Sequence, residues 1–125
     1  MSRYCYIIVF FLLTKEFIDK NYSGTTANTT YWAPDLYYKE GDEYPYWFYL
    51  STSCGLGGRN SVISLIKAKS PGLWDGEYAD AGVVIASKEN NNYNTNCIDA
   101  NIFTDTDGKT YFIWGSFWKG IYMAE

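Results

Sequence analysis

The sequence predicts an all-β protein built of short strands, and three observations predict this. Aromatic side chains, which favour pleated sheets, make up 20% of the 125 residues. From residue 31 onward, short apolar or alternating runs are separated by turns rich in Gly, Pro, Asp and Asn. No segment shows the periodicity of an amphipathic helix. The length suits one small domain rather than two.

A first group of four strands is predicted in the middle of the chain. An acidic turn, a Gly-rich loop and the turn Ser70-Pro71-Gly72 separate its members. The third member alternates, with Val62, Ser64 and Ile66 on one side and Ile63 and Leu65 on the other. The predicted strands are residues 31–38, 45–51, 60–69 and 82–86.

A second group of strands follows an Asn-rich loop. We predict strands at residues 97–104 and 110–116, joined by a hairpin turn at Asp107-Gly108, and the start of a third at 120–124. The pattern of residues 34–37, an acidic Gly turn and an aromatic strand recurs from residue 100. Four-stranded units that recur along a chain are typical of propeller blades.

The first 30 residues do not share this rhythm. The apolar run at residues 4–13 is too short to span a bilayer, so no membrane span is predicted. It is either a buried strand or part of an upstream element, or the remnant of a signal-peptide core that lacks the usual cleavage motif. Residues 21–30 are small and polar and are predicted to form a loop.

Composition excludes several classes of function. The net charge of −4, with only ten scattered Lys and Arg residues, argues against nucleic-acid binding. The chain has no His, which excludes Ser-His-Asp and Cys-His catalysis and His-based zinc sites. Three distant cysteines, Cys5, Cys54 and Cys97, indicate no disulfide framework. Residues 105–108 begin like a calcium loop but lack its closing Glu, so a hairpin turn is expected there.

Three motifs carry a family resemblance. They are WAPD at residues 32–35, NCIDAN at 96–101 and WGSFWKGI at 114–121. In this order and spacing they resemble glycoside hydrolase family 43, and more narrowly its endo-α-1,5-arabinanases. The resemblance covers residues 31–125 and leaves residues 1–30 unmatched. It implies a partial five-bladed β-propeller, with one complete four-stranded blade and part of the next.

The resemblance implies inverting O-glycosyl hydrolysis of arabinan or arabino-oligosaccharides. Such a reaction needs a protonated general acid and an ionised general base, and a third carboxylate that orients the acid and tunes its pKa. Asp99 matches this third carboxylate. Asp19 and Glu125 match neither the base nor the acid, so we expect the chain to be incomplete and inactive by itself. The family's axial metal ion depends on a His that this sequence lacks, so no cofactor or metal is predicted.

The same resemblance implies a set of sugar-binding positions. Cys97 stands where the family has Ala, and Ala100 where it has Pro. We expect Trp32, Phe117 and Trp118 either to stack on substrate or to pack inside the protein. Asp35 is expected to support the structure, and Trp114 to lie in the core. The predicted substrate-binding residues are Trp32, Gly55, Asn96, Cys97, Ile98, Ser116, Phe117 and Trp118.

Two other functions stay open at this stage. The chain could be a non-catalytic sugar-binding module that self-associates through open strand edges. It could also have the specificity of the family's arabinofuranosidases or xylosidases. In each case the resemblance implies a secreted or periplasmic protein.

Overall fold

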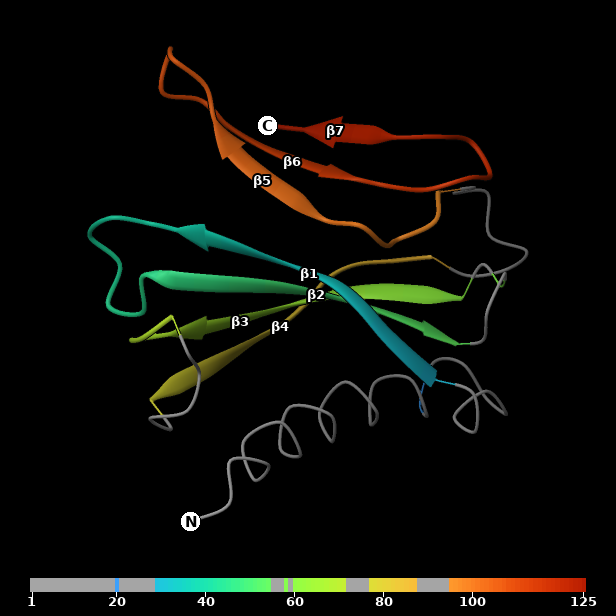
Figure 1. Cartoon of the computed structure of the whole chain (residues 1–125), viewed down its shortest axis with the longest axis horizontal. Helices are drawn as coiled ribbons and strands as arrows, with labels where there is room; N and C mark the ends of the chain where they lie inside the picture. The colour runs from blue at the N-terminus through green and yellow to red at the C-terminus, as the bar shows by residue number, and fades with distance from the viewer. Residues whose placement is uncertain (1–19, 21–28, 55–57, 59, 72–76, 88–94) are drawn as a thin grey trace.

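A computed structural model describes residues 20, 29–54, 58, 60–71, 77–87 and 95–125 (Figure 1). Lys20 has helical backbone, and the elements with defined bounds in these ranges are strands. The apolar run at residues 4–13 lies outside the described residues. The strands are β1 (Thr29–Tyr38), β2 (Tyr46–Cys54), β3 (Ser61–Ala68), β4 (Tyr78–Ser87), β5 (Asn101–Thr104), β6 (Thr110–Trp114) and β7 (Tyr122–Ala124).

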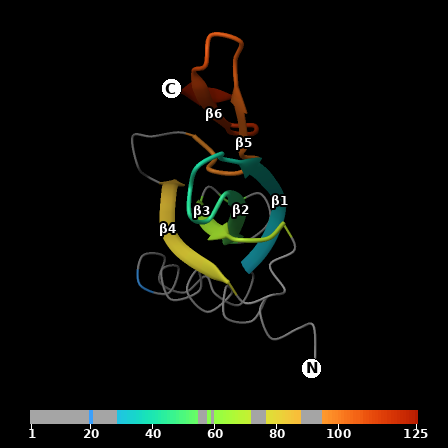
Figure 2. The ribbon, with the colours of Figure 1, turned by 90° about the vertical axis from the view of Figure 1, so that its left-hand side faces the viewer.

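The strands form two antiparallel sheets, which confirms the predicted grouping. The first sheet has the order β1-β2-β3-β4 and the second the order β5-β6-β7. Figure 2 shows the twist of the first sheet, in which β1 and β4 lie on opposite sides of β2 and β3. The second sheet lies against one face of the first (Figure 1).

Several strand boundaries differ from the prediction; β2, for example, ends at Cys54 rather than at residue 51. Strand β1 starts at Thr29, inside the predicted loop at residues 21–30. Strand β4 starts at Tyr78 rather than at Gly82, because Gly82, with φ of 81°, forms a bulge that the strand runs through. Strand β5 starts only at Asn101, so residues 97–100 do not belong to it. This last difference determines how the candidate site is built.

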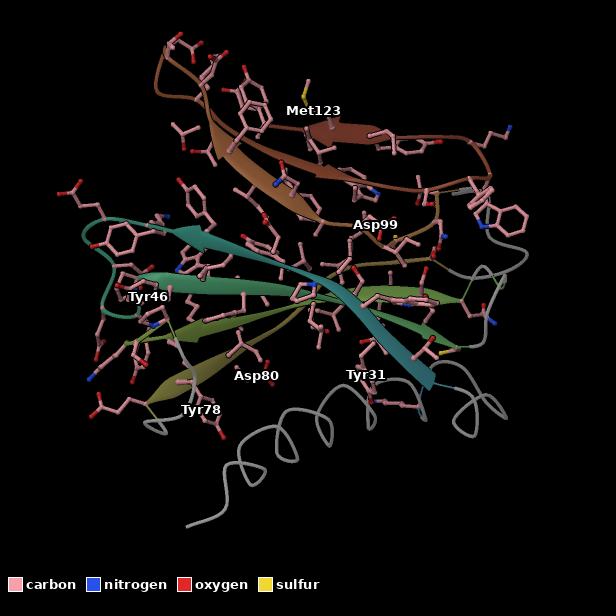
Figure 3. All side chains as sticks on the ribbon, in the orientation of Figure 1. Tyr31, Tyr46, Tyr78, Asp80, Asp99 and Met123 are labelled. Atoms are coloured by element: carbon pink, nitrogen blue, oxygen red, sulfur yellow. The ribbon has the colours of Figure 1, made fainter. Side chains whose placement is uncertain are left out.

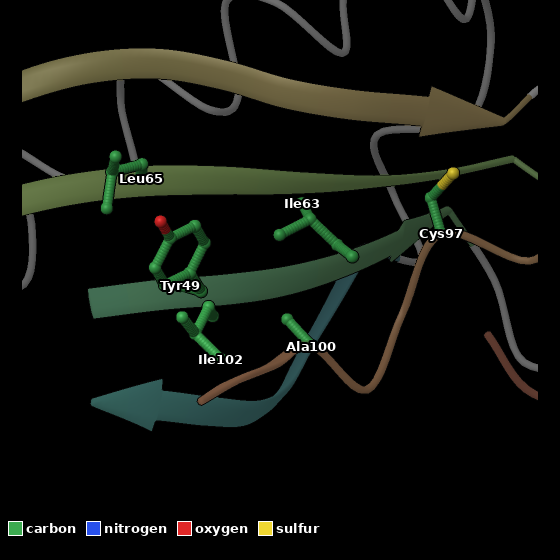
Figure 4. Packing of buried hydrophobic residues seen from close by; sticks show 6 residues of the cluster. All are labelled: Tyr49, Ile63, Leu65, Cys97, Ala100 and Ile102. Atoms are coloured by element: carbon green, nitrogen blue, oxygen red, sulfur yellow. The ribbon is translucent and has the colours of Figure 1, made fainter. Parts of the chain in front are cut away.

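The main core fills the space between the sheets. Tyr49, Ile63 and Leu65 of the first sheet pack against Ala100 and Ile102 on the segment that enters the second sheet (Figure 4). Phe112 and Trp114 of β6 pack against this cluster, as expected for Trp114, and the Tyr49 and Phe112 rings are 5.6 Å apart. Such aromatic burial contributes strongly to stability.

Polar contacts also join the two sheets. Asp35 Oδ2 accepts the backbone N–H of Ile102 at 2.8 Å and the Asn101 side-chain amide at 3.3 Å. The Tyr37 hydroxyl lies 2.9 Å from Thr104 Oγ1. Asp35 therefore has the supporting role that its place after Pro34 suggested.

Other predictions can be checked locally. The Asp105 N–H donates to Lys109 O at 2.8 Å and the Gly108 N–H to Asp105 O at 2.9 Å, which confirms the hairpin turn. Cys54 and Cys97, the cysteines in the described part of the chain, are buried and form no disulfide there. Cys5 lies outside the described residues. Among the described residues, no helix is long and apolar enough to cross a membrane.

Candidate functional site

The residues of the predicted site converge on the segment 95–100, which passes from the first sheet to the second. This segment runs over one end of the first sheet, where the strands present serines. Ser51 of β2, Ser61 of β3 and Ser87 of β4 are 0%, 0% and 1% exposed. Antiparallel pairing brings them together, because Ser51 faces Ile63 across β2 and β3, and Ser61 faces Ser87 across β3 and β4.

Asn96 and Cys97 bind to this serine layer. Ser61 Oγ donates to Asn96 Oδ1 at 2.7 Å, and the Cys97 N–H points to Ser61 Oγ at 3.0 Å and to Ser87 Oγ at 3.2 Å. An amide oxygen only accepts, so the Ser61 hydroxyl donates its proton to Asn96 Oδ1. In the 2.7 Å bond between the two serines, the Ser87 hydroxyl is therefore the donor and Ser61 Oγ the acceptor. Asn96 is 7% exposed and Cys97 is 0% exposed. Their side chains therefore support the site from inside.

The thiol of Cys97 is expected to be unreactive as a nucleophile. Burial raises its pKa, because desolvation penalises the thiolate. A thiol held neutral in this way is a poor nucleophile. The chemistry available at the segment is therefore that of its carboxylate, Asp99.

Asp99 lies on the irregular stretch before β5 (Figure 3). We expected it in an apolar strand, which is wrong: β5 begins two residues later, and the Asp99 side chain is exposed. Its backbone has φ of 57° and its N–H donates to Ser51 Oγ at 3.0 Å. The carboxylate has no hydrogen-bond partner within the described ranges. The Asp99 carboxylate thus faces solvent, while the Asp99 backbone is hydrogen-bonded to the first sheet through Ser51.

Trp32 lies over the same end of the first sheet. It faces Ser51 across β1 and β2, and its Nε1 donates to Ser53 Oγ at 3.1 Å. A bulge follows between Trp32 and Asp35, where Ala33 has φ of 38°. The indole is 37% exposed, so one part of it packs while another part faces solvent.

The loop after β6 supplies the remaining residues. The Gly115 N–H donates to Ile98 O at 2.9 Å, which joins this loop to the Asp99 segment. Ser116 is partly buried, whereas Phe117 is 85% and Trp118 is 42% exposed. Phe117 and Trp118 have φ of 53° and 35°, a region that side-chain-bearing residues rarely occupy.

The structure thus brings most of the predicted residues together. Ser51 connects Trp32 with Asp99, and Gly115 connects the half-buried Ile98 with the aromatic loop. Four non-glycine residues of positive φ lie in these segments, and strained backbone of this kind is concentrated at functional sites. Gly55 lies outside the described residues.

Sequence reasoning missed the three supporting serines. The available signal was a serine at or next to one end of each of three predicted strands: Ser51 ends 45–51, Ser61 lies near the start of 60–69, and Ser87 follows 82–86. Buried hydroxyls need partners, so each such serine was a candidate for binding backbone of another segment.

The arrangement is suited to polyol chemistry rather than to metal chemistry. Exposed aromatic faces stack on the C–H faces of sugar rings, and a nearby carboxylate can accept hydroxyl protons. Within the described ranges, no three His, Cys, Asp or Glu side chains lie close enough to hold a metal ion. The described residues therefore do not fit the axial metal ion that the family resemblance implies.

Comparison with known sequences gives a consistent result. The sequence model of the glycosyl hydrolases family 43 matches residues 13–125. Extracellular endo-α-(1→5)-L-arabinanase 1 of Bacillus subtilis is 40% identical over 94 residues, which are 75% of this chain and 27% of that protein. Arabinan endo-1,5-α-L-arabinosidase B of Emericella nidulans is 33% identical over 99 residues, which are 74% and 23% of the two chains.

Two solved structures are also similar. An exo-1,5-α-L-arabinanase from a bovine ruminal metagenomic library has a TM-score of 0.61 and 34% identity, over 74% of this chain and 30% of that one. An α-L-arabinanase of Cellvibrio cellulosa complexed with arabinohexaose has a TM-score of 0.54 and 31% identity, over 74% and 29%. The chain spans about a quarter of the length of the curated relatives, between 23% and 29%.

Proposed function

The chain belongs to family 43 of the glycosyl hydrolases, and from this premise we propose that it serves arabinan degradation by inverting O-glycosyl hydrolysis. Its two sheets are one four-stranded blade and part of the next in a five-bladed β-propeller. The observation that carries the proposal is Asp99, an exposed carboxylate on a segment that is hydrogen-bonded to Ser51 and to the loop that carries the exposed Phe117 and Trp118.

We assign Asp99 the role of the carboxylate that orients the general acid and keeps its pKa raised. A negative charge near a carboxylic acid opposes loss of its proton, which keeps the acid ready to protonate the leaving oxygen. No residue of this sequence is assigned the role of base or acid.

Sugar contact is assigned to the exposed part of the site. Ile98, Ser116, Phe117 and Trp118 present side chains or backbone on the accessible side. Trp32 is the proposed stacking platform, and Gly55 remains a proposed contact. Asn96 and Cys97 contribute to binding by holding the segment in place.

The relatives support a proposal for the substrate class and the location. One similar structure was solved with arabinohexaose, and one relative is named as extracellular. We therefore propose an arabino-oligosaccharide ligand and a secreted protein. Exo and endo enzymes both occur among the similar proteins, so end products must be measured to assign the mode of attack.

Binding can be measured directly by titrating the 125-residue protein with arabinohexaose while recording tryptophan fluorescence. We expect saturable binding, and Trp118→Ala should weaken it at least about fivefold because a stacked ring contact is lost. Tyr38→Ala is the matched control, since Tyr38 is 56% exposed at the other end of β1. Equal responses to arabinohexaose and xylohexaose would refute arabinan recognition and favour a xylosidase-like specificity.

Catalysis needs a separate assay. Reducing ends released from linear arabinan are expected to stay at background for the 125-residue protein, because no carboxylate of this sequence matches the family's general base or general acid. Release that Asp99→Asn abolishes would show that this chain itself carries the missing roles. The products would then distinguish arabinanase from arabinofuranosidase action.

A non-catalytic sugar-binding module that self-associates is the second candidate. It is favoured by exposed apolar side chains on the outer face of the second sheet, where Phe103 is 38% and Met123 is 60% exposed. Sheets with such faces and open edges tend to associate. Sedimentation that finds only monomer at every concentration, together with no binding of arabinohexaose, would exclude this candidate.

A further inference from the structure

The buried hydroxyls of the first sheet fall into three groups. That of Ser53 accepts the Trp32 Nε1–H. Those of Ser51, Ser61 and Ser87 all bond to the segment that carries Asp99. Those of Thr52 and Ser64 are equally buried, at 0% and 4% exposure, and have no hydrogen-bond partner. Burying a hydroxyl without a hydrogen-bond partner costs free energy. A buried serine that bonds to the Asp99 segment therefore differs physically from a buried serine that has no partner.

The bonded serines accept hydrogen bonds from backbone N–H groups around Asp99. The Cys97 N–H is shared by two hydroxyls, the Ile98 N–H bonds to Asn96 O at 3.0 Å, and the Asp99 N–H bonds to Ser51. No regular ladder reaches these N–H groups, because the segment precedes β5. Without the serines, the buried Cys97 N–H and the part-buried Asp99 N–H would lose these acceptors.

The backbone at Asp99 requires such support. With φ of 57° it occupies the left-handed region, which is unfavourable for a residue with a side chain, although less so for Asp than for most. A strained conformation persists only where its surroundings hold it. The bond to Ser51 is the contact that holds the Asp99 amide itself.

We propose that Ser51 is a positioning residue for Asp99, and that Ser61 and Ser87 position the preceding residues in the same way. Ser51 sets the direction of the Asp99 carboxylate through the backbone and touches no substrate. This inference deepens the proposed function and rests on it.

The test compares Ser51→Ala with Ser64→Ala in the 125-residue protein. Amide hydrogen exchange followed by NMR is expected to show the Asp99 N–H about tenfold less protected in Ser51→Ala, because its hydrogen bond to Ser51 Oγ is lost. Ser64→Ala should leave it unchanged. Ser61→Ala should instead lower the protection of the Cys97 N–H, which keeps only its bond of 3.2 Å to Ser87 Oγ. Ser51→Thr keeps the hydroxyl oxygen and should restore protection at Asp99.

A second measurement tests whether the position of Asp99 affects the affinity for arabinohexaose. Arabinohexaose affinity is expected to fall in Ser51→Ala, and the same change made in Asp99→Asn should have a much smaller effect, because Ser51 acts through Asp99. Unchanged Asp99 protection in Ser51→Ala would overturn the positioning role, whatever the affinity. Wild-type protein that binds no arabinohexaose but loses protection in Ser51→Ala would instead refute the proposed function alone.

Discussion

Removing the Asp35 carboxylate should weaken the contact between the two sheets without removing a hydrogen bond inside either one. Asp35 lies on β1, yet its Oδ2 accepts the Ile102 N–H at 2.8 Å and the Asn101 amide at 3.3 Å at the start of β5. Ile102 is 9% exposed and belongs to the core cluster, so water cannot easily replace the lost acceptor.

The magnitude follows from these two bonds. A hydrogen bond to a charged acceptor contributes about 1.5–3 kcal/mol, and the longer bond from the exposed Asn101 adds little. We therefore expect Asp35→Ala to lower the free energy of unfolding by about 2 kcal/mol. Asp35→Asn keeps a neutral acceptor oxygen and should lose about half as much.

Urea unfolding monitored by tryptophan fluorescence measures this change. A loss of about 2 kcal/mol should move the midpoint down by about 1 M urea. Asp80→Ala is the matched control, because Asp80 accepts the Gly82 N–H at 2.8 Å within one exposed stretch of β4. If Asp35→Ala cost no more than Asp80→Ala, the proposed link between the sheets would be refuted.

Three further changes have defined outcomes. A methyl group at Gly115, where φ is 118°, would collide with Gly120 O, whereas a methyl group at Gly108 meets nothing within 4 Å. Gly115→Ala should therefore lower the melting temperature far more than Gly108→Ala does. Equal losses in melting temperature would contradict this. Burial raises the pKa of Tyr49 to about 12, above its ordinary value of 10.0, so the protonated phenol stabilises the fold fully below pH 10 and this stability is lost as pH rises towards 12. Tyr49→Phe should remove that part of the pH dependence in urea titrations, and an identical profile would refute it. Lys67→Met removes an ion pair of 3.0 Å and a cation–π contact, and should cost about 1 kcal/mol, less at high salt; salt-independent unfolding would count against this.

Several features could be read from residues alone because their causes are local. Turn residues such as Asp107 and Gly108 bend the chain whatever surrounds them, and the hairpin is where they indicated. The family motifs likewise identified Asp99 and the aromatic loop without any knowledge of contacts. The β1 start and the run of β4 through Gly82 were missed, because pairing with a neighbouring strand can extend a strand past a local signal.

The sequence by itself determined the strand order, the turns and the family, since these depend on local pattern and on motifs in register. Only the tertiary structure decided that Asp99 is exposed on a left-handed turn, while Asn96 and Cys97 point inward. The reason is that their orientation depends on hydroxyls from Ser51, Ser61 and Ser87, which lie 10 to 48 residues from their hydrogen-bond partners and meet the segment only after the first sheet has paired.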